Sequence, residues 1–354
     1  MGFLFLLSLG GFSPHSTFDS GKDIYVILPD TGELQLISKE FIRGFNLALG
    51  DSIPYYRVNE TEEDIPFDTL FLSIIQKKPF LVVGPILPSN ARIAADLSMR
   101  NRVIDILPIA YDVYLGTYGN YVYPFNYKTY ASIIKFLDYA SRKGDTAFVL
   151  IYENTLNGLS IKKFFDVFYP VPSIMVKKSS IKKSFVREIL KDIRGFRAIF
   201  FSDGGLPSLN LYLNLRKMGF KGNVYALDGW LDRKIVSLLI GFTDNLYVFG
   251  LYGPRYSSYL LRLDRKYAFI ENYRRRFNEE PTQMAFIGYD AGTLVRDVYI
   301  NATDVDSAKS YLLHYGVLYG VSGDYLISKD KEYIGVYRIT PRGIVKVEEG
   351  NPKE

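Results

Sequence analysis

The chain has 354 residues, more than one ordinary domain, and 48% of them are hydrophobic, so two lobes with sizeable cores are expected. The net charge of +5 comes from scattered basic residues, and no nucleic-acid-binding motif accompanies the densest cluster, residues 274–276, which we interpret as a solvated helix face. The absence of cysteine excludes disulfides and thiol chemistry, and the two histidines, His15 and His314, argue against a histidine triad or a multi-histidine metal site.

Residues 1–12 form an apolar run of signal-peptide length that is too short to span a bilayer. No basic residue precedes this run, and without a cysteine there is no lipoprotein attachment site. We interpret residues 1–21 as a signal-like segment of an exported periplasmic or extracytoplasmic protein, soluble after processing; the alternative is a frayed N-terminus. Scarce glutamine and abundant Lys, Glu and Tyr are compatible with a thermophilic source.

The first part of the chain alternates predicted strands and helices. Short apolar runs without a polar face indicate strands covered on both sides, and apolar residues at helical spacing indicate helices. The predicted strands are residues 23–28, 55–58, 80–83 and 103–107, and the helices are residues 38–49, residues 67–77 and one that opens at Ser89 or Asn90. This alternation is typical of a doubly wound parallel sheet.

Residues 79–112 hold a strand, a turn, a helix, a second strand and a second turn. Two strand ends and one helix N-terminus therefore point the same way. Since open parallel sheets bind ligands at the carboxyl ends of their strands, a site is expected at the turns 85–90 and 109–112.

The second half of the chain repeats the alternation. The predicted strands are residues 147–152, 174–176, 198–201, 224–227 and 246–251, and the predicted helices are residues 130–142, 158–168, 185–193, 206–218, 259–278 and 284–301. Residues 316–340 instead alternate apolar and polar side chains around three glycines, as antiparallel strands do.

Over residues 22–340 the chain resembles the type I periplasmic solute-binding proteins, the group of the leucine/isoleucine/valine-binding proteins and their receptor relatives. The residues that carry this resemblance, in order, are Pro29-Asp30-Thr31-Gly32, Gly44, Gly84-Pro85, Ile106-Leu107-Pro108, Ser202-Asp203-Gly204-Gly205, Arg216-Lys217-Met218-Gly219, Asp228-Gly229-Trp230, Pro281-Thr282, Gly288-Tyr289-Asp290-Ala291 and Gly323-Asp324-Tyr325.

The resemblance implies an α/β fold of two similar doubly wound open-sheet lobes, with a ligand cleft between them. Three crossings, near residues 121–124, 249–252 and 313–320, would join the lobes. Lobe 1 would take residues 22–122 plus 251–314, and lobe 2 residues 123–250 plus 315–345, leaving 346–354 as a tail. Such proteins clamp a small molecule for the permease of an ABC transporter, carry out no chemistry on it and need no cofactor or metal.

The resemblance also indicates ligand positions, and nearly all of them differ from those of the amino-acid-binding members. A hydroxyl position has become Pro88, one residue before Ser89, and an Ala-Thr pair has become Ala110-Tyr111. The acid that receives an ammonium group falls at Lys128. The predicted ligand-binding residues are Ser89, Asn90, Ala110, Tyr111, Lys128, Asn157, Asp228 and Trp230.

A cation where an ammonium group should be received disfavours an α-amino acid, because like charges repel in a partly dry cleft. If Lys128 faces the cleft, an organic or aromatic acid becomes more attractive; the alternative is a solvated lysine beside the hinge. Trp230, the single tryptophan, either packs the following helix or contacts the ligand.

The sequence has no P-loop, no Gly-x-Ser-x-Gly elbow and no Gly-x-Gly-x-x-Gly after a strand, so an enzyme is not expected. We predict an extracytoplasmic solute-binding protein, monomeric or homodimeric, whose ligand is not a standard α-amino acid. The alternative is a protein-interaction module similar to the activators of penicillin-binding proteins, in which the cleft need not hold a ligand.

Overall fold

The computed structural model describes residues 21–32, 34–62, 64–176, 182–251, 256–340 and 343–347. The predicted signal-like segment at residues 1–21 lies outside this part except for its last residue, and the predicted tail at 346–354 lies outside it except for its first two residues. Within the described ranges, no helix is both long enough and apolar enough to cross a membrane.

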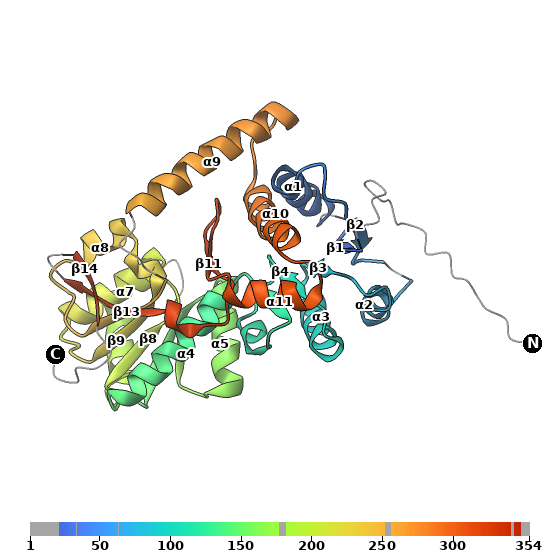
Figure 1. The fold of residues 1–354 in the computed structure, drawn as a ribbon. Helices are drawn as coiled ribbons and strands as arrows, with labels where there is room; N and C mark the ends of the chain where they lie inside the picture. Colours follow the sequence, from blue (N-terminus) through green and yellow to red (C-terminus); the bar gives the residue numbers. More distant parts are fainter. Residues whose placement is uncertain are drawn as a thin grey trace, which may run out of the picture. The chain divides into compact units, whose positions relative to one another are not determined.

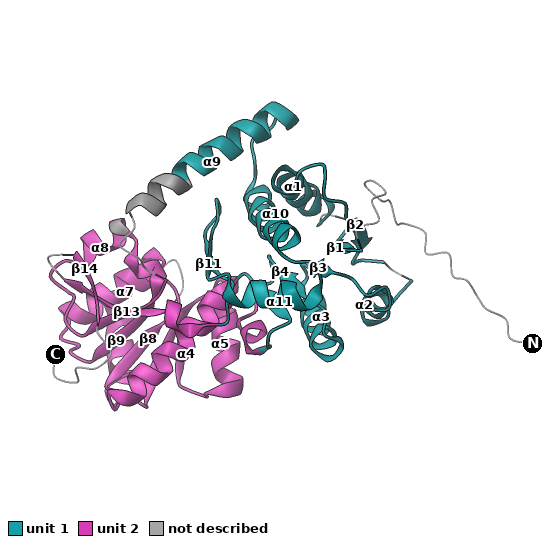
Figure 2. Ribbon diagram, viewed as in Figure 1, with its two compact units in different colours: residues 1–110, 118–125, 255–329 teal, residues 111–117, 126–254, 330–354 magenta. Residues whose placement is uncertain are grey.

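The chain forms two compact units (Figure 2). Within the described residues, unit 1 is drawn from Met1–Ala110, Tyr118–Phe125 and Arg255–Lys329, and unit 2 from Tyr111–Thr117, Asn126–Pro254 and Asp330–Glu354. These bounds differ from the predicted lobes at four places. Residues 123–125 and 315–329 belong to unit 1 rather than to lobe 2, and residues 111–117 and residue 251 belong to unit 2 rather than to lobe 1.

Unit 1 is built on a five-stranded, all-parallel sheet in the order β2-β1-β3-β4-β5. Its strands are β1 (Ile24–Leu28), β2 (Tyr56–Asn59), β3 (Leu81–Val83), β4 (Asp105–Leu107) and β5 (Val122–Pro124). The central strands carry apolar side chains on both faces, so both faces have to be shielded from water. A hydrophobic core lies on each face, which confirms the predicted doubly wound sheet.

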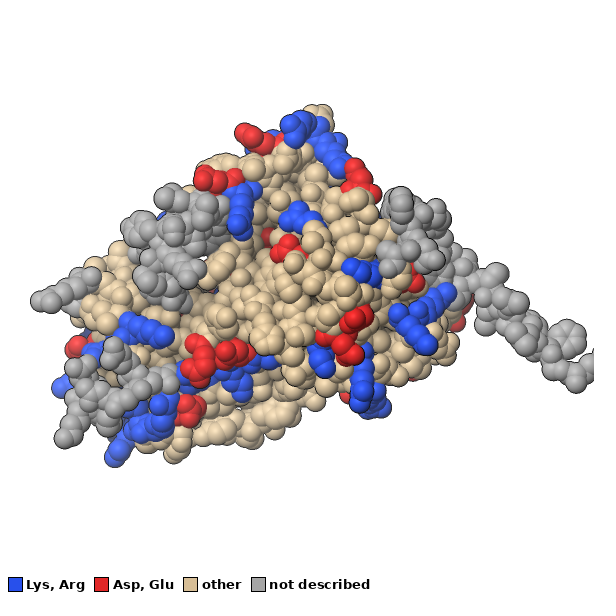
Figure 3. Space-filling view, viewed as in Figure 1, with Lys and Arg blue, Asp and Glu red and all other residues tan. Residues whose placement is uncertain are grey.

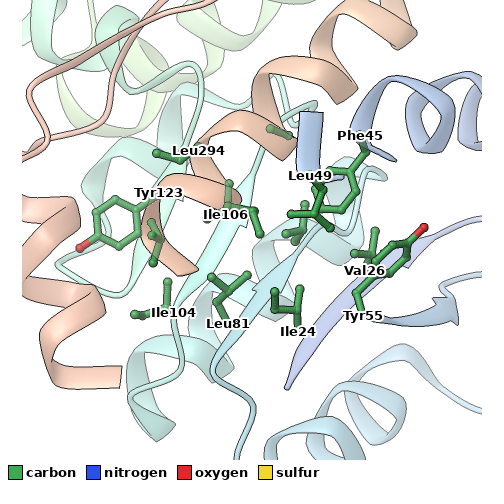
Figure 4. Close-up of a cluster of buried hydrophobic side chains, with 14 of the residues drawn as sticks. Ile24, Val26, Phe45, Leu49, Tyr55, Leu81, Ile104, Ile106, Tyr123 and Leu294 are labelled. Atoms are coloured by element: carbon green, nitrogen blue, oxygen red, sulfur yellow. The ribbon is translucent and has the colours of Figure 1, made fainter. Parts of the chain in front are cut away.

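Helices cover both faces of this sheet (Figure 1). On one face the core joins the strands to α1 (Leu34–Leu49), α10 (Gln283–Asn301) and α11 (Val305–His314), and on the other to α2 (Phe67–Ile75) and α3 (Pro88–Asn101). Figure 4 shows part of the first core, in which Ile24, Leu81 and Ile106 of three strands lie near Phe45 and Leu294 of two helices. The long helix α9 (Tyr256–Phe277) also belongs to unit 1.

Glycines allow α1 and α10 to pack side by side (Figure 1). A side chain at Gly44 would overlap the backbone carbonyl of Ala285, and one at Gly288 would overlap the carbonyl of Phe41. This close approach explains two of the glycines that carry the family resemblance, and it ties an early helix to one more than 200 residues later in the chain.

A two-stranded antiparallel sheet, β11 (Val317–Tyr319) and β12 (Asp324–Leu326), is fixed to α10 by Asp290. The buried Asp290 carboxylate accepts hydrogen bonds from the backbone N–H groups of Val321 (2.7 Å) and Ser322 (2.9 Å) and from the Ser322 hydroxyl. Burial raises the pKa of Asp290 to about 6. This tether, together with the packing of Leu318 and Ile327 in the core of unit 1, explains why residues 315–329 group with unit 1.

Unit 2 is built on a seven-stranded sheet in the order β14-β13-β10-β9-β8-β6-β7. Its parallel strands are β6 (Phe148–Glu153), β7 (Ser173–Val176), β8 (Ala198–Phe201), β9 (Asn223–Leu227) and β10 (Leu246–Gly250). The strands β13 (Gly335–Thr340) and β14 (Gly343–Lys346) add antiparallel to one side. The predicted antiparallel character of the late chain is thus confirmed.

The helices of unit 2 again lie on two faces. One core includes α4 (Tyr127–Arg142) and α5 (Leu156–Phe168), and the other includes α6 (Lys183–Asp192) and α7 (Leu206–Lys217). The short helix α8 (Arg233–Leu239) and α11 of unit 1 were not predicted from the sequence.

Candidate functional site

The five strands of the main sheet of unit 1 run parallel, so their carboxyl ends lie at one edge of that sheet, the edge where open α/β sheets bind ligands. Gly84 follows β3 there with a φ of +94°, and a side chain at this position would overlap the carbonyl of Ile27. The turn that leads into α3 is therefore held against β1 and requires glycine.

Glu60, directly after β2, is the central polar group of this edge, and sequence reasoning missed it. Its side chain is 4% exposed. One carboxylate oxygen accepts from the N–H of Ile86 at 3.1 Å, and the other accepts from the N–H of Leu87 at 3.3 Å. Burial outweighs these hydrogen bonds and raises the pKa of Glu60 to about 7. An acid that follows a strand directly is the one signal that could have singled it out.

The prediction that Ser89 or Asn90 caps α3 is wrong. The helix begins at Pro88, its N-cap residue is Leu87, and no side chain bonds to the helix end in the manner of an N-cap. Ser89 is exposed, whereas the Asn90 amide donates at 3.3 Å to the same Glu60 carboxylate oxygen as the Leu87 N–H. Proline is favoured at the first helical position because its missing N–H would have no partner in the helix.

A second polar cluster lies at the ends of β1 and β2. The Asn59 side-chain oxygen accepts from the N–H groups of Asp30 (2.8 Å) and Thr61 (3.1 Å), and the Asp30 carboxylate forms an ion pair with Arg57. Nearby, Arg57 lines a surface depression of about 790 Å³ along α1, together with Gly32, Gln35, Leu36, Lys39, Ile42 and Arg43. Arg43 is paired with Glu40 and Glu279, so the cations of this depression have acidic neighbours.

Ala110 and Tyr111 differ in exposure and belong to different units. Ala110, in unit 1, is 3% exposed, whereas the Tyr111 side chain, in unit 2, is 46% exposed. Tyr111 therefore presents a large aromatic surface to solvent in unit 2, and Ala110 offers little more than its backbone.

In unit 2 the structure brings two predicted site residues together. The Lys128 ammonium, in the first turn of α4, lies 2.8 Å from a carboxylate oxygen of Asp228, which follows β9. The two side chains are 26% and 25% exposed. A side chain at Gly250, in β10, would overlap Asp228. Lys128 is thus neither a fully solvated residue nor an isolated cation.

Another polar cluster of unit 2 joins the ends of β6 and β8. The Asp203 carboxylate accepts from the Glu153 N–H (3.2 Å), the Thr155 hydroxyl (2.9 Å) and the Ser202 hydroxyl. Glu153, 5% exposed, accepts in turn from the N–H of Ser208 in the first turn of α7 at 3.2 Å. Glu153 and the role of Asp203 were not predicted from the sequence.

Trp230 packs in the core of unit 2. Its side chain is fully buried, its indole N–H donates to the backbone carbonyl of Asp203 at 2.8 Å, and its ring packs on Phe201 and Tyr212. Of the two roles left open by the sequence, the structure supports packing. Asn157 lies in the first turn of α5, partly exposed, beside the N-cap residue Thr155.

Large apolar side chains are exposed at the starts of three helices that follow strand ends. They are Leu36 of α1 in unit 1 (64%) and Leu156 of α5 and Leu206 of α7 in unit 2 (71% and 66%). Elsewhere, on the face drawn in Figure 3, basic and acidic side chains are mixed, and neither sign forms a continuous field. Among the described residues, no group of three or more histidine or acidic side chains could hold a metal ion.

The arrangement of strands and helices matches solved structures of transport proteins. A putative branched-chain amino acid ABC transporter protein of Rhodospirillum rubrum is 15% identical, with a TM-score of 0.53 over 92% of this chain and 99% of that one. An ABC transporter substrate-binding protein of Sphaerobacter thermophilus is 15% identical, with a TM-score of 0.48 over 93% and 96%. No family model and no curated protein matches the sequence.

Proposed function

We propose that this chain, which has the fold of the type I periplasmic solute-binding proteins, binds a small solute at the carboxyl edges of its two sheets. The observation that carries the proposal is the repeated architecture. In each unit, polar groups held by hydrogen bonds or an ion pair lie at the carboxyl ends of the parallel strands. They are grouped around Glu60 in unit 1 and around Asp203 and Asp228 in unit 2. Such edges are where open α/β sheets bind ligands.

The proposed ligand is not a standard α-amino acid. An ammonium group needs an available acid, and the carboxylate closest to the expected position, Asp228, already pairs with Lys128. The Lys128–Asp228 pair also makes an organic or aromatic acid, the ligand class predicted from the sequence, less favoured. An acid bound at Lys128 would have to compete with Asp228 for the ammonium group, so acids remain a class to be tested against sugars and other uncharged solutes.

The clamp mechanism predicted from the sequence is part of this proposal. A ligand that contacts both lobes stabilises the closed form by its higher affinity for that form. The protein would act outside the cytoplasm, deliver its ligand to the permease of an ABC transporter and carry out no chemistry on it.

A thermal-unfolding screen with organic acids, aromatic acids and sugars tests the proposal, because a ligand that binds only the folded protein raises Tm. We expect one compound class to raise Tm and to decrease the radius of gyration measured by X-ray scattering. Native mass spectrometry of the purified protein would identify a retained solute. No response to any compound, together with binding to a peptidoglycan synthase, would favour the protein-interaction alternative.

A further inference from the structure

Glu60 holds its carboxylate where the backbone of unit 1 presents N–H groups at the start of a helix. The N–H groups of Ile86 and Leu87 come directly before α3 and point at the two oxygens of one carboxylate. N–H groups in this arrangement attract anions, because they have no partner within the helix and lie at the positive end of its dipole. Here the anion is a side chain of the protein itself.

Both oxygens of the Glu60 carboxylate accept hydrogen bonds within the protein. The carboxylate has three donors in total, since the Asn90 amide adds a third at 3.3 Å, and the side chain is almost completely shielded from solvent. A ligand carboxylate could reach the same N–H groups only by displacing Glu60. Two carboxylates at this place would also repel each other strongly, because the surroundings exclude water.

Unit 2 has a similar arrangement, in which a different buried glutamate accepts a hydrogen bond from an N–H group at a helix start. Glu153, at the end of β6, accepts from the Ser208 N–H at the start of α7, and a side chain at Gly205 would lie 2.6 Å from both of its carboxylate oxygens. The helices that follow β3 and β8 therefore both begin against a buried glutamate at the end of another strand of the same sheet, β2 in unit 1 and β6 in unit 2. The repetition indicates that internal carboxylates at these helix starts are a regular feature of this chain.

We infer that Glu60 fills the anion-binding N–H groups of unit 1 in place of a ligand carboxylate, so that it selects against ligands that would present a carboxylate to α3. This inference rests on the proposed function and deepens it. A ligand recognised by unit 1 presents an uncharged group there, and an acidic ligand has to place its charge elsewhere.

Substitution Glu60→Ala tests the inference with acetate as the probe. Removing the side chain leaves the Ile86 and Leu87 N–H groups without an acceptor beside a space of carboxylate size. We expect a lower Tm for this variant in sodium chloride, a saturable rise of Tm with acetate at constant ionic strength, and acetate-dependent shifts of the two amide resonances. The wild-type protein and Glu60→Gln, whose side chain still fills the space, should not respond.

Asp105→Ala is the matched control for a buried acid of the same unit. Asp105 is fully buried, and within the described part of the chain neither carboxylate oxygen has a hydrogen-bond partner. Its removal leaves a space without N–H donors, so acetate should not restore stability. If Glu60→Ala responds to acetate no more than Asp105→Ala does, the inference is wrong.

A measurement on the wild-type protein covers the case in which Glu60→Ala does not fold. The groups that contact Glu60 are two backbone N–H groups and the Asn90 amide, none of which titrates. The amide resonances of Ile86 and Leu87 should therefore move as the Glu60 carboxyl titrates, with its pKa raised by burial to about 7, and should not move in Glu60→Gln. Resonances that are the same in the wild type and in Glu60→Gln at every pH would overturn the inference, because the Glu60 carboxylate would then not hold these N–H groups.

The outcomes separate this inference from the proposed function. If the wild-type protein binds a carboxylate ligand and that ligand shifts the Ile86 and Leu87 resonances, solute binding is supported and the role of Glu60 is refuted. If no solute binds but Glu60→Ala gains an acetate response, the role of Glu60 stands and the proposed function fails.

Discussion

The ion pair between Lys128 and Asp228 allows a quantitative test of the charge arrangement in unit 2. The charged atoms lie 2.8 Å apart, and about three quarters of each side chain is shielded from solvent. Exposed pairs contribute roughly 0–1 kcal/mol, whereas breaking a buried pair costs roughly 3–5 kcal/mol, because one charge remains without compensation. We therefore expect Asp228→Asn or Lys128→Met to lower the free energy of unfolding by about 2 kcal/mol each.

Trp230 provides the assay, because it is the only tryptophan and is buried in the core of unit 2, the unit that contains the pair. Urea unfolding followed by its fluorescence reports on unit 2. In a double-mutant cycle, Lys128→Met and Asp228→Asn together should cost less than the sum of the single changes, with a coupling energy of about 1–2 kcal/mol.

The pair Lys162–Asp166 is the control. It joins the same residue types on the surface of α5, at 2.5 Å, with the lysine side chain also 26% exposed and the aspartate 50%. Because it is a solvent-exposed pair four residues apart on a helix, its coupling energy should be only about 0.3–0.5 kcal/mol. Equal coupling energies for the two pairs would refute the argument that partial burial strengthens the contact of Lys128 with Asp228.

Three further predictions concern unit 1. Asp290→Ala should release the β11–β12 hairpin and destabilise unit 1 by roughly 2–4 kcal/mol, since buried N–H groups lose their acceptor; hydrogen exchange of the hairpin should rise, and unchanged protection would contradict this. Gly288→Ala should cost more than about 2 kcal/mol, because the methyl group would overlap the backbone of α1, whereas the control Gly195→Ala in unit 2, which meets no neighbouring atom, should cost less than about 0.5 kcal/mol; urea unfolding followed by circular dichroism, which reports on both units, measures the two. Burial raises the pKa of Asp105 well above 3.8, so its stabilising contribution is complete below that pH and is lost as the pH rises toward the folded pKa. Asp105→Asn should therefore reduce the loss of stability as the pH rises above 3.8, and an unchanged pH profile would argue against this role.

Much of the fold follows from local patterns. Apolar runs such as residues 24–28 and 198–201 are buried strands, and the helical spacing of apolar residues indicated most of the helices between them. The start of α3 was placed one or two residues late, because Ser89 and Asn90 are good capping residues in isolation, whereas the structure uses Pro88 as the first helical residue. Local preference therefore located the helix but not its cap.

The candidate site depended much less on local pattern. Lys128 and Asp228 were each singled out, but their contact joins residues 100 positions apart, and the sequence gives no sign that one neutralises the other. Glu60 belongs to the acidic stretch 60–64, and only the contact of its side chain with the turn before α3 buries it among N–H donors. Trp230 was open to two roles until the core around it was known.

The sequence by itself determined the alternation of strands and helices, the class of fold and the edge of the sheets at which polar groups gather, since these depend on the periodicity of neighbouring residues. The tertiary structure alone decided which charges are already paired within the protein. Burial and distance set the strength of an ionic contact, and both arise only when segments far apart in the chain pack together.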